Sequence, residues 1–207
     1  MAELRSRRRV ARRSGSRRGQ RGAVLVEAAL ILPVLILVVV GIIEFGLLFT
    51  SYSTANGSSR SGGRLAATAY SQAGASSTAQ ATAAEQIALA AAADLKVLNN
   101  AVPVGMAIYK VNPSSADGAP SGGFPGDNMV GGCSADCIKY SWNAASDTMV
   151  KTSGAWTNAD ACGVDVDSIG VYVQVKHSYI LNMFGRDHYA DAHTVMRLEP
   201  LPADQCS

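Results

Sequence analysis

The residues that come closest to a metal-binding cluster in this chain lie between positions 187 and 193. Asp187 directly precedes His188, and Asp191 stands two positions before His193. Successive side chains on a strand point to opposite faces, so Asp191 and His193 would share a face that His188 does not. Two ligands without a third ligand or a supporting shell do not hold a metal. We therefore predict polar side chains at the start of a strand, with no metal and no cofactor.

Other patterns that could carry chemistry are incomplete. Ser178 follows His177 but lacks the glycine-flanked turn of a catalytic nucleophile. Asp165 and Asp167 lack the further oxygen ligands of a calcium loop. Neither a glycine-rich phosphate loop nor a His-Glu-x-x-His motif occurs in the sequence. The sequence predicts a protein that is not an enzyme and has no catalytic residues.

Two carboxylates at the ends of a long apolar run are more informative. Residues 28–43 contain no charged side chain, and Glu27 and Glu44 lie 17 positions apart. That separation is about 25 Å along a helix, which nearly matches a hydrocarbon core of about 30 Å. Each carboxylate would then lie near one membrane interface, where acidic residues are costly and tend to have a function. For Glu44, snorkelling to water without a further role is an equally good interpretation.

The apolar run predicts a transmembrane helix over residues 23–50, because it exceeds the ~20 residues that a bilayer core requires. Pro33 lies inside this helix and would remove one backbone hydrogen bond and bend the axis. Gly41 and Gly46 would let another helix approach closely. These three residues and the two carboxylates are the candidates for packing within a membrane assembly.

The segment before the run indicates the orientation. Residues 1–22 contain nine of the 18 basic residues and one acidic residue, Glu3. Arginines beside a membrane span hold their side in the cytoplasm, so we expect a basic cytoplasmic leader and an extracytoplasmic C-terminal part. Nucleic-acid binding is a weaker interpretation, because no aromatic residue is interleaved with the arginines. An ordinary secretory signal, cleaved near residues 51–55, is a further alternative.

Cleavage after Gly22 would give Glu27 a specific partner. Ala23 would become the N-terminus, and its amine would lie one helical turn from the Glu27 carboxylate, a spacing at which opposite charges attract. In a packed bundle this carboxylate could instead neutralise the Ala23 amine of a neighbouring copy, which would favour one axial register. Gly22, Ala23 and Glu27 are therefore the candidate processing residues.

Beyond the membrane, residues 51–77 are rich in Ser, Gly and Ala and predict a stalk or linker, either helical or flexible. Arg60 and Arg64 are the only charged residues in it and would share one face of a continued helix. These juxtamembrane arginines are either solvated or in contact with lipid headgroups or a neighbouring protein.

Residues 78–207 predict an extracytoplasmic α+β domain. An Ala-rich helix is expected over residues 78–99, capped by Ser77 or Thr78 and stopped at Asn99-Asn100. Alternating apolar residues then predict a small antiparallel sheet. The expected strands cover residues 102–111, 138–142, 148–156 with a turn at 153–154, 169–179 and 190–198.

Two strands have a clear apolar face. The residues expected to share a face are Val102, Val104, Met106 and Ile108 in one strand, and Ile169, Val171, Val173 and Val175, opposite Tyr172, Gln174 and Lys176, in the other. Residues 112–132 are dense in Pro, Gly, Ser and Asp and predict a long exposed loop.

Four cysteines lie in the part expected outside the cytoplasm: Cys133, Cys137, Cys162 and Cys206. An even number of cysteines in a small exported domain favours two disulfides, and three pairings are open. A zinc site would need a second close pair to match Cys133 and Cys137, and none is present.

The junction at Gly22 resembles a known processing site. Gly22 followed by Ala23 to Val26 and Glu27 is similar to the type IV prepilin site, where a membrane aspartyl peptidase cuts after the glycine and glutamate is the fifth mature residue. The stretch from Gly22 to Pro33, followed by Gly41-Ile-Ile-Glu-Phe-Gly, resembles the TadE family of pilin-like proteins. The segment Arg60-Ser-Gly-Gly-Arg64 resembles the continuation of that family's motif.

The resemblance implies a pilin-like fold and a place in the tight-adherence (Flp pilus) machinery. A prepilin peptidase, other pilin-like subunits and further tight-adherence proteins are the implied partners. Ala28 replaces the aromatic residue that follows the glutamate in the major Flp pilin, which favours a minor pilin or pseudopilin.

Our leading hypothesis from the sequence is a TadE-like structural subunit of the cell (inner) membrane that takes part in pilus assembly, with its outer domain outside the cytoplasm. The alternative is a signal-anchored extracytoplasmic binding domain that never enters a filament. An exported enzyme is the weakest hypothesis, because no catalytic group supports it.

Overall fold

The computed structural model describes residues 18–74, 76–98, 101–162, 165–180 and 185–206. Residues 1–17 of the expected leader and the expected helix stop at Asn99-Asn100 lie outside the described residues. The chain forms two compact units, Met1–Ile43 and Glu44–Ser207, and each is considered by itself.

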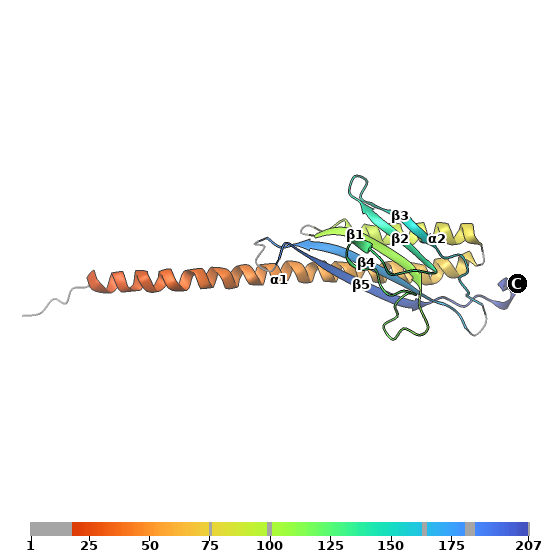
Figure 1. The fold of residues 1–207 in the computed structure, drawn as a ribbon, viewed down its shortest axis with the longest axis horizontal. Coiled ribbons are helices and arrows are strands. Elements are labelled where there is room, and N and C mark those ends of the chain that lie inside the picture. The colour runs from red at the N-terminus through yellow and green to blue at the C-terminus, as the bar shows by residue number, and fades with distance from the viewer. Residues whose placement is uncertain (1–17, 75, 99–100, 163–164, 181–184, 207) are drawn as a thin grey trace, which may run out of the picture. The chain divides into compact units, whose positions relative to one another are not determined.

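The described residues form two α-helices, five strands and two short 3₁₀-helices (Figure 1). In chain order they are α1 (Arg18–Ala73), α2 (Ser77–Leu95), β1 (Ala101–Lys110), η1 (Asp127–Met129), β2 (Cys137–Asn143), β3 (Thr148–Ala155), β4 (Ser168–Ser178), β5 (Asp187–Arg197) and η2 (Ala203–Gln205). The expected α+β class with an antiparallel sheet is confirmed.

The part of α1 in the first unit is apolar and exposed. Among the described residues, one helix is long and apolar enough to cross a membrane, over Gly22–Ala73. Its large side chains are exposed, as Leu25 (71% exposed) and Ile42 (68%) illustrate. α1 continues through Pro33, a residue that membrane helices tolerate.

The part of α1 in the second unit corrects the expectation of a solvated stalk. Residues 51–73 remain helical and bury their small side chains against the domain, with Ala55 and Ala66 fully inaccessible. Gly62 and Gly63 allow the closest approach: a Cβ at Gly62 would lie 3.2 Å from Val171 Cγ1. Small residues recur on this face of α1. The Ser, Gly and Ala residues that suggested a linker therefore allow the helix to pack closely on the sheet.

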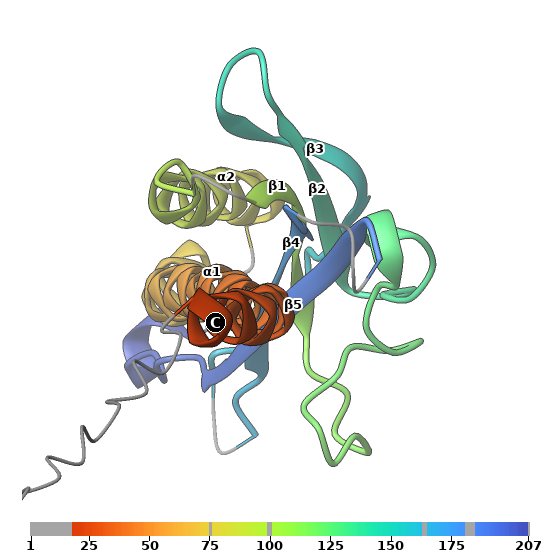
Figure 2. The ribbon, with the colours of Figure 1, turned by 90° about the vertical axis from the view of Figure 1, so that its left-hand side faces the viewer.

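The sheet has the order β3-β2-β1-β4-β5, with every neighbouring pair antiparallel. Figure 2 shows α1 and α2 side by side on one face of it. The expected apolar face of β4 is confirmed, because Ile169, Val171, Val173 and Val175 are all buried in the main core with the helices. α2 contributes an Ala-rich face to this core and is capped by Ser76, whose Oγ accepts from Ala79 N, rather than by Ser77 or Thr78.

Two strand details differ from expectation. A register shift between Pro103 and Gly105 breaks the alternation of β1, so Val102 is exposed while Met106 and Ile108 stay in the core. β3 does not turn at residues 153–154; it runs on to Ala155, with an irregular register opposite β2.

The loop over residues 112–132, here called the strap, is not simply exposed. It lies on the face of the sheet opposite the helices (Figure 2). Phe124 stacks on Tyr172 with ring centroids 5.5 Å apart, and the Tyr172 hydroxyl donates to the Pro125 carbonyl at 3.2 Å. The strap thus covers aromatic side chains on β1 and β4 that would otherwise meet water.

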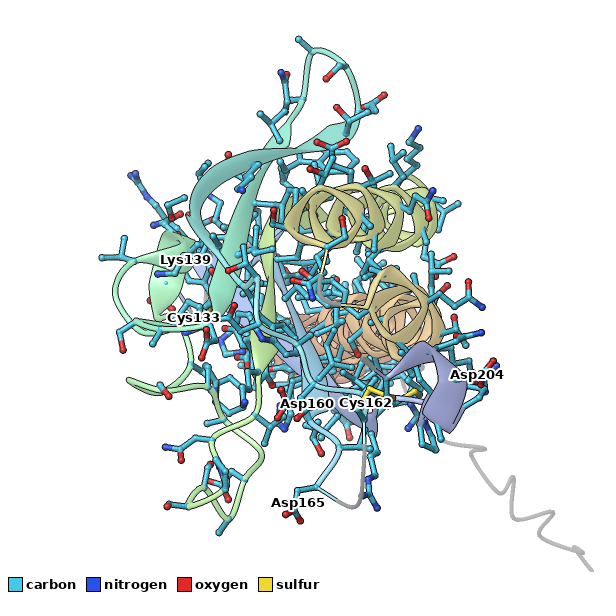
Figure 3. The ribbon with its side chains drawn as sticks, turned by 90° about the vertical axis from the view of Figure 1, so that its right-hand side faces the viewer. Cys133, Lys139, Asp160, Cys162, Asp165 and Asp204 are labelled. Carbon is cyan, nitrogen blue, oxygen red and sulfur yellow. A yellow bond between two sulfur atoms is a disulfide. The ribbon has the colours of Figure 1, made fainter. Side chains whose placement is uncertain are left out.

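The cysteines form two disulfides, Cys133–Cys137 and Cys162–Cys206. The first joins the residue that follows the strap to the first residue of β2. The second joins the segment before β4 to the residue after η2, and Figure 3 shows its yellow bond beside Cys162. The expectation of two disulfides is confirmed, and one of the three open pairings is selected.

Candidate functional site

The candidate processing residues lie on an exposed part of α1. Gly22, Ala23 and Glu27 are all helical and exposed. A Cβ added at Gly22 would meet no atom within 4 Å. Ala23 and Glu27 are one helical turn apart, as the expected pairing of an Ala23 amine with the Glu27 carboxylate requires.

The candidate packing positions of the apolar segment are open as well. A Cβ at Gly41 or at Gly46 would meet nothing within 4 Å. Because large apolar side chains surround these glycines and are exposed along α1, this surface needs lipid or another apolar helix to keep it from water.

Glu44 does not follow the snorkelling interpretation. It is 3% exposed and belongs to the compact unit that begins at this residue. The fully buried His177 of β4 lies close enough for the Glu44 carboxylate to act on its charge. Ser51, two helical turns after Glu44, approaches the same imidazole, with Oγ 3.2 Å from Nδ1. We call Glu44, Ser51 and His177 the buried polar cluster.

Ser51 connects the helix to the imidazole in this cluster. Its hydroxyl donates to the Leu47 carbonyl at 3.1 Å within α1, and its oxygen lies within hydrogen-bond distance of His177 Nδ1. Burial lowers the pKa of His177, while the Glu44 carboxylate raises it and His188 lowers it. The cluster ties α1 to β4 with a histidine that burial keeps neutral.

A second polar contact flanks this cluster. The Tyr52 hydroxyl lies 2.8 Å from His188 Nε2 on β5, with the two rings 5.9 Å apart. Burial raises the pKa of Tyr52, so its hydroxyl keeps its proton in this contact. α1 is therefore hydrogen-bonded to both β4 and β5 through adjacent residues of one turn.

From the sequence, His177 was considered only beside Ser178, and neither it nor Ser51 was placed near Glu44, although a signal for the position of His177 was available. His177 continues the alternating apolar face of β4 two positions after Val175, which places it on the helix side of the sheet. Ser51 lies seven positions after Glu44, a spacing that returns to nearly the same face of a helix.

Arg60 and Arg64 are both exposed on α1. The glycines between them face the sheet, and a Cβ at Gly63 would lie 3.1 Å from Thr194 Cγ2. This part of the motif therefore combines a packed glycine pair with two exposed arginines.

The remaining polar candidates have structural partners. Ser178 Oγ donates to Asp187 at 2.7 Å, and Asp167 forms an ion pair with Lys110 at 2.8 Å. His193 packs on Phe124 of the strap at 4.5 Å between ring centroids. Within the described ranges, no group of three or more His, Cys, Asp or Glu residues could hold a metal ion.

Comparison with known families agrees with the expected resemblance. Residues 22–64 match the TadE-like protein family, a segment that begins at the candidate cleavage glycine and ends at Arg64. The match supports a pilin-like protein of the tight-adherence system with a candidate N-terminal membrane anchor. No curated protein and no solved structure matches the chain.

Proposed function

We propose that this chain, with its TadE-like segment at residues 22–64, is a pseudopilin or minor pilin that takes part in assembling Flp-type pili. The observation that carries the proposal is the position of this segment. It joins Gly22 and Glu27, the exposed apolar stretch of α1 and the glycine pair that packs on the sheet.

In this proposal the apolar stretch holds the protein in the cell membrane. Exposed Leu, Ile and Val side chains are stable in lipid or against apolar helices of other subunits. The basic leader keeps the N-terminus in the cytoplasm, and the disulfide-linked domain lies outside. The protein acts as a structural subunit rather than an enzyme.

A prepilin peptidase would cut after Gly22 and release an amine at Ala23. The open surroundings of Gly22 and its helical spacing from Glu27 support this step. Glu27 would then neutralise the new amine of its own chain or of a neighbour, which favours one register between subunits.

The direct test is N-terminal sequencing of the mature protein from cells that make the pilus. A chain that begins at Ala23 is expected. Gly22→Val should leave the leader attached, because a branched side chain then stands at the scissile bond. Gly19→Val, the matched glycine change within the leader, should leave the cut at Ala23.

Other N-termini would contradict the proposal in distinct ways. An intact Met1 leader in the wild-type protein would remove the processing step and favour a signal-anchored binding domain. A start near residues 51–55 would indicate ordinary secretion and remove the membrane subunit altogether.

A further inference from the structure

Glu44 is buried at the position where the sequence places the outer membrane interface. It follows the uncharged run of residues 28–43 and is the first residue of the second unit, and its side chain is only 3% exposed. A part of the outer domain must therefore extend along α1 as far as this residue. We call the position of a residue along the axis of α1 its level. The contacts between α1 and the sheet show which part of the domain reaches the level of Glu44.

Strand β4 runs beside α1 in the opposite direction (Figure 1). Ser51 Oγ lies 3.2 Å from His177 Nδ1, and a Cβ at Gly62 would lie 3.2 Å from Val171 Cγ1. Positions 51 to 62 cover about 17 Å along a helix, and positions 171 to 177 cover about 20 Å along a strand. Because these lengths nearly agree, β4 follows the axis of α1 closely. The chain after His177 therefore continues towards the level of Glu44.

The strand ladder continues past the end of β4. Tyr179 N donates to the Arg186 carbonyl at 3.0 Å, one pair beyond the last pair of β4 and β5. From position 177 to Ile180 an extended chain reaches up to about 10 Å, and from position 51 back to Glu44 a helix covers about the same distance. Ile180 therefore lies near the level of Glu44.

The side chains near this level suit the boundary between acyl chains and headgroups. Ile180 is 59% exposed, and Phe45 and Phe49 of α1 are 61% and 74% exposed. Arg186, bonded through its carbonyl to Tyr179, is also exposed. Residues 181–184, which follow Ile180 in the sequence, carry no charge. Apolar and aromatic side chains accompanied by a basic residue are typical of a membrane interface.

We propose that the end of β4 at Ile180 contacts the outer leaflet of the membrane, so that the outer domain has a lipid contact of its own beside the span. This inference rests on the membrane placement in the proposed function. Phospholipid is the occupant because α1 itself brings the bilayer to the level of Glu44, and the headgroup region adds about 5–8 Å beyond the hydrocarbon core. Ile180 would meet acyl chains, and the Arg186 guanidinium would meet lipid phosphate.

Quenching of tryptophan fluorescence by brominated lipid tests the contact, with the full chain in phosphatidylcholine vesicles. Ile180→Trp adds an indole near the level of Glu44, and more than half of the added emission should be lost when the acyl chains carry bromine near the headgroup. Leu35→Trp reports on the span and should be quenched as well.

Leu89→Trp is the matched control on α2, because Leu89 is 58% exposed, almost the same as Ile180. It lies two positions before Ala91, whose carbonyl accepts from Ser58 Oγ. Its level is thus about 24 Å from that of Glu44. The emission that this variant adds should be the same with and without bromine.

The outcomes separate this inference from the membrane span. Quenching at position 35 without quenching at position 180 would overturn the lipid contact and leave the span intact. Lack of quenching at both positions would overturn the membrane placement, and the lipid contact with it. Equal quenching at positions 89 and 180 would show that the effect is not specific to the level of Glu44, which would also overturn the contact.

A second measurement needs no substitution. In lipid nanodiscs that hold one copy of the wild-type chain, a nuclear Overhauser cross-peak is expected between the Ile180 δ-methyl group and acyl-chain protons. The buried Ile169 methyl group should show none. Contact of the Ile180 methyl group with water alone would contradict the proposal.

Discussion

The two parts of helix α1 differ in the size and burial of their side chains. Residues 24–43 consist mostly of large apolar residues, and nearly all of them are exposed. In residues 51–73, Ala, Ser and Gly predominate, and about half of the side chains are buried. Judged by hydrophobicity alone, the first part would form the core and the second would lie at the surface.

The comparison shows that burial of a side chain in α1 depends on its size and on the surface that the helix meets at that point. Small side chains in the second part let the helix approach β4 and β5. Their hydroxyls can also bond to neighbouring elements, as Ser58 Oγ does when it donates to the Ala91 carbonyl of α2 at 2.9 Å. Large side chains in the first part present an apolar surface that suits lipid or other helices. The following predictions test this contrast, from the largest expected effect to the smallest.

Glu27→Ala should abolish pilus formation while leaving the protein in the membrane. The proposed register contact is lost, but a helix with one charge fewer inserts at least as readily. Electron microscopy of pili and membrane fractionation with immunoblotting measure the two effects. Glu85→Ala, which removes an exposed carboxylate from α2, should leave pili at wild-type numbers. Normal piliation of the Glu27 variant at normal protein levels would contradict an assembly role for this residue.

Replacing both Cys162 and Cys206 by Ser should lower the unfolding free energy of the outer domain by about 4 kcal/mol, on the loop-entropy scale for a separation of 44 residues. The same change at Cys133 and Cys137, separated by four residues, should cost about 2 kcal/mol. Denaturant titration of the full chain in detergent measures both losses. Membrane insertion should be unaffected in either variant, because the apolar stretch does not contain these residues. Equal losses in the two variants would contradict the loop-length argument.

Gly62→Leu should destabilise the outer domain by about 1–3 kcal/mol, because the new side chain overpacks the contact with Val171. Gly57→Leu is the matched control in the same helix, where an added Cβ meets no atom within 4 Å. There the better helix propensity of Leu should stabilise the protein by up to about 1 kcal/mol. Thermal unfolding followed by circular dichroism distinguishes the two. Similar melting temperatures would show that α1 is not tightly packed at this point.

His177→Gln should flatten the pH dependence of domain stability below the ordinary histidine pKa of 6.5. Burial lowers the pKa of His177, so the unfolded chain binds this proton more readily than the folded one. In the wild-type protein, stability is therefore full above pH 6.5 and falls as the pH decreases below it. His193→Gln, at an exposed histidine, should keep the wild-type slope. Unfolding midpoints measured between pH 7.5 and 5 test this, and a wild-type slope that His177→Gln does not change would refute the assignment.

Local patterns predicted the main elements because those patterns reflect backbone geometry. The alternation at residues 169–175 matched the buried face of β4, and the Ala-rich stretch matched α2 to within four residues at its end. The strap was harder to predict. Its Pro, Gly and Ser content indicates a loop, but Phe124 alone does not indicate that the loop would lie over the aromatic side chains of the sheet.

The candidate functional residues also fall into two groups, those that the sequence indicated and those that only the structure showed. Gly22, Glu27 and the apolar run could be singled out from residue spacing, because a candidate processing motif and a candidate membrane span are each defined by residues close together in the chain. The contact of Ser51 with His177 joins residues 126 positions apart, and no local pattern indicates which strand a helix will meet.

The amino-acid sequence by itself indicated a basic N-terminal segment, one apolar helix with a carboxylate at each end, a resemblance to TadE-like proteins and an α+β domain with four cysteines. Only the tertiary structure decided that Glu44 is buried near His177, that residues 51–73 are a packed part of α1, and that the strap covers the sheet. The physical reason is the sequence distance over which each effect can be recognised. Secondary-structure propensity, hydropathy and charge patterns are visible among residues close together in the chain. Burial depends on contacts with residues far away in the sequence.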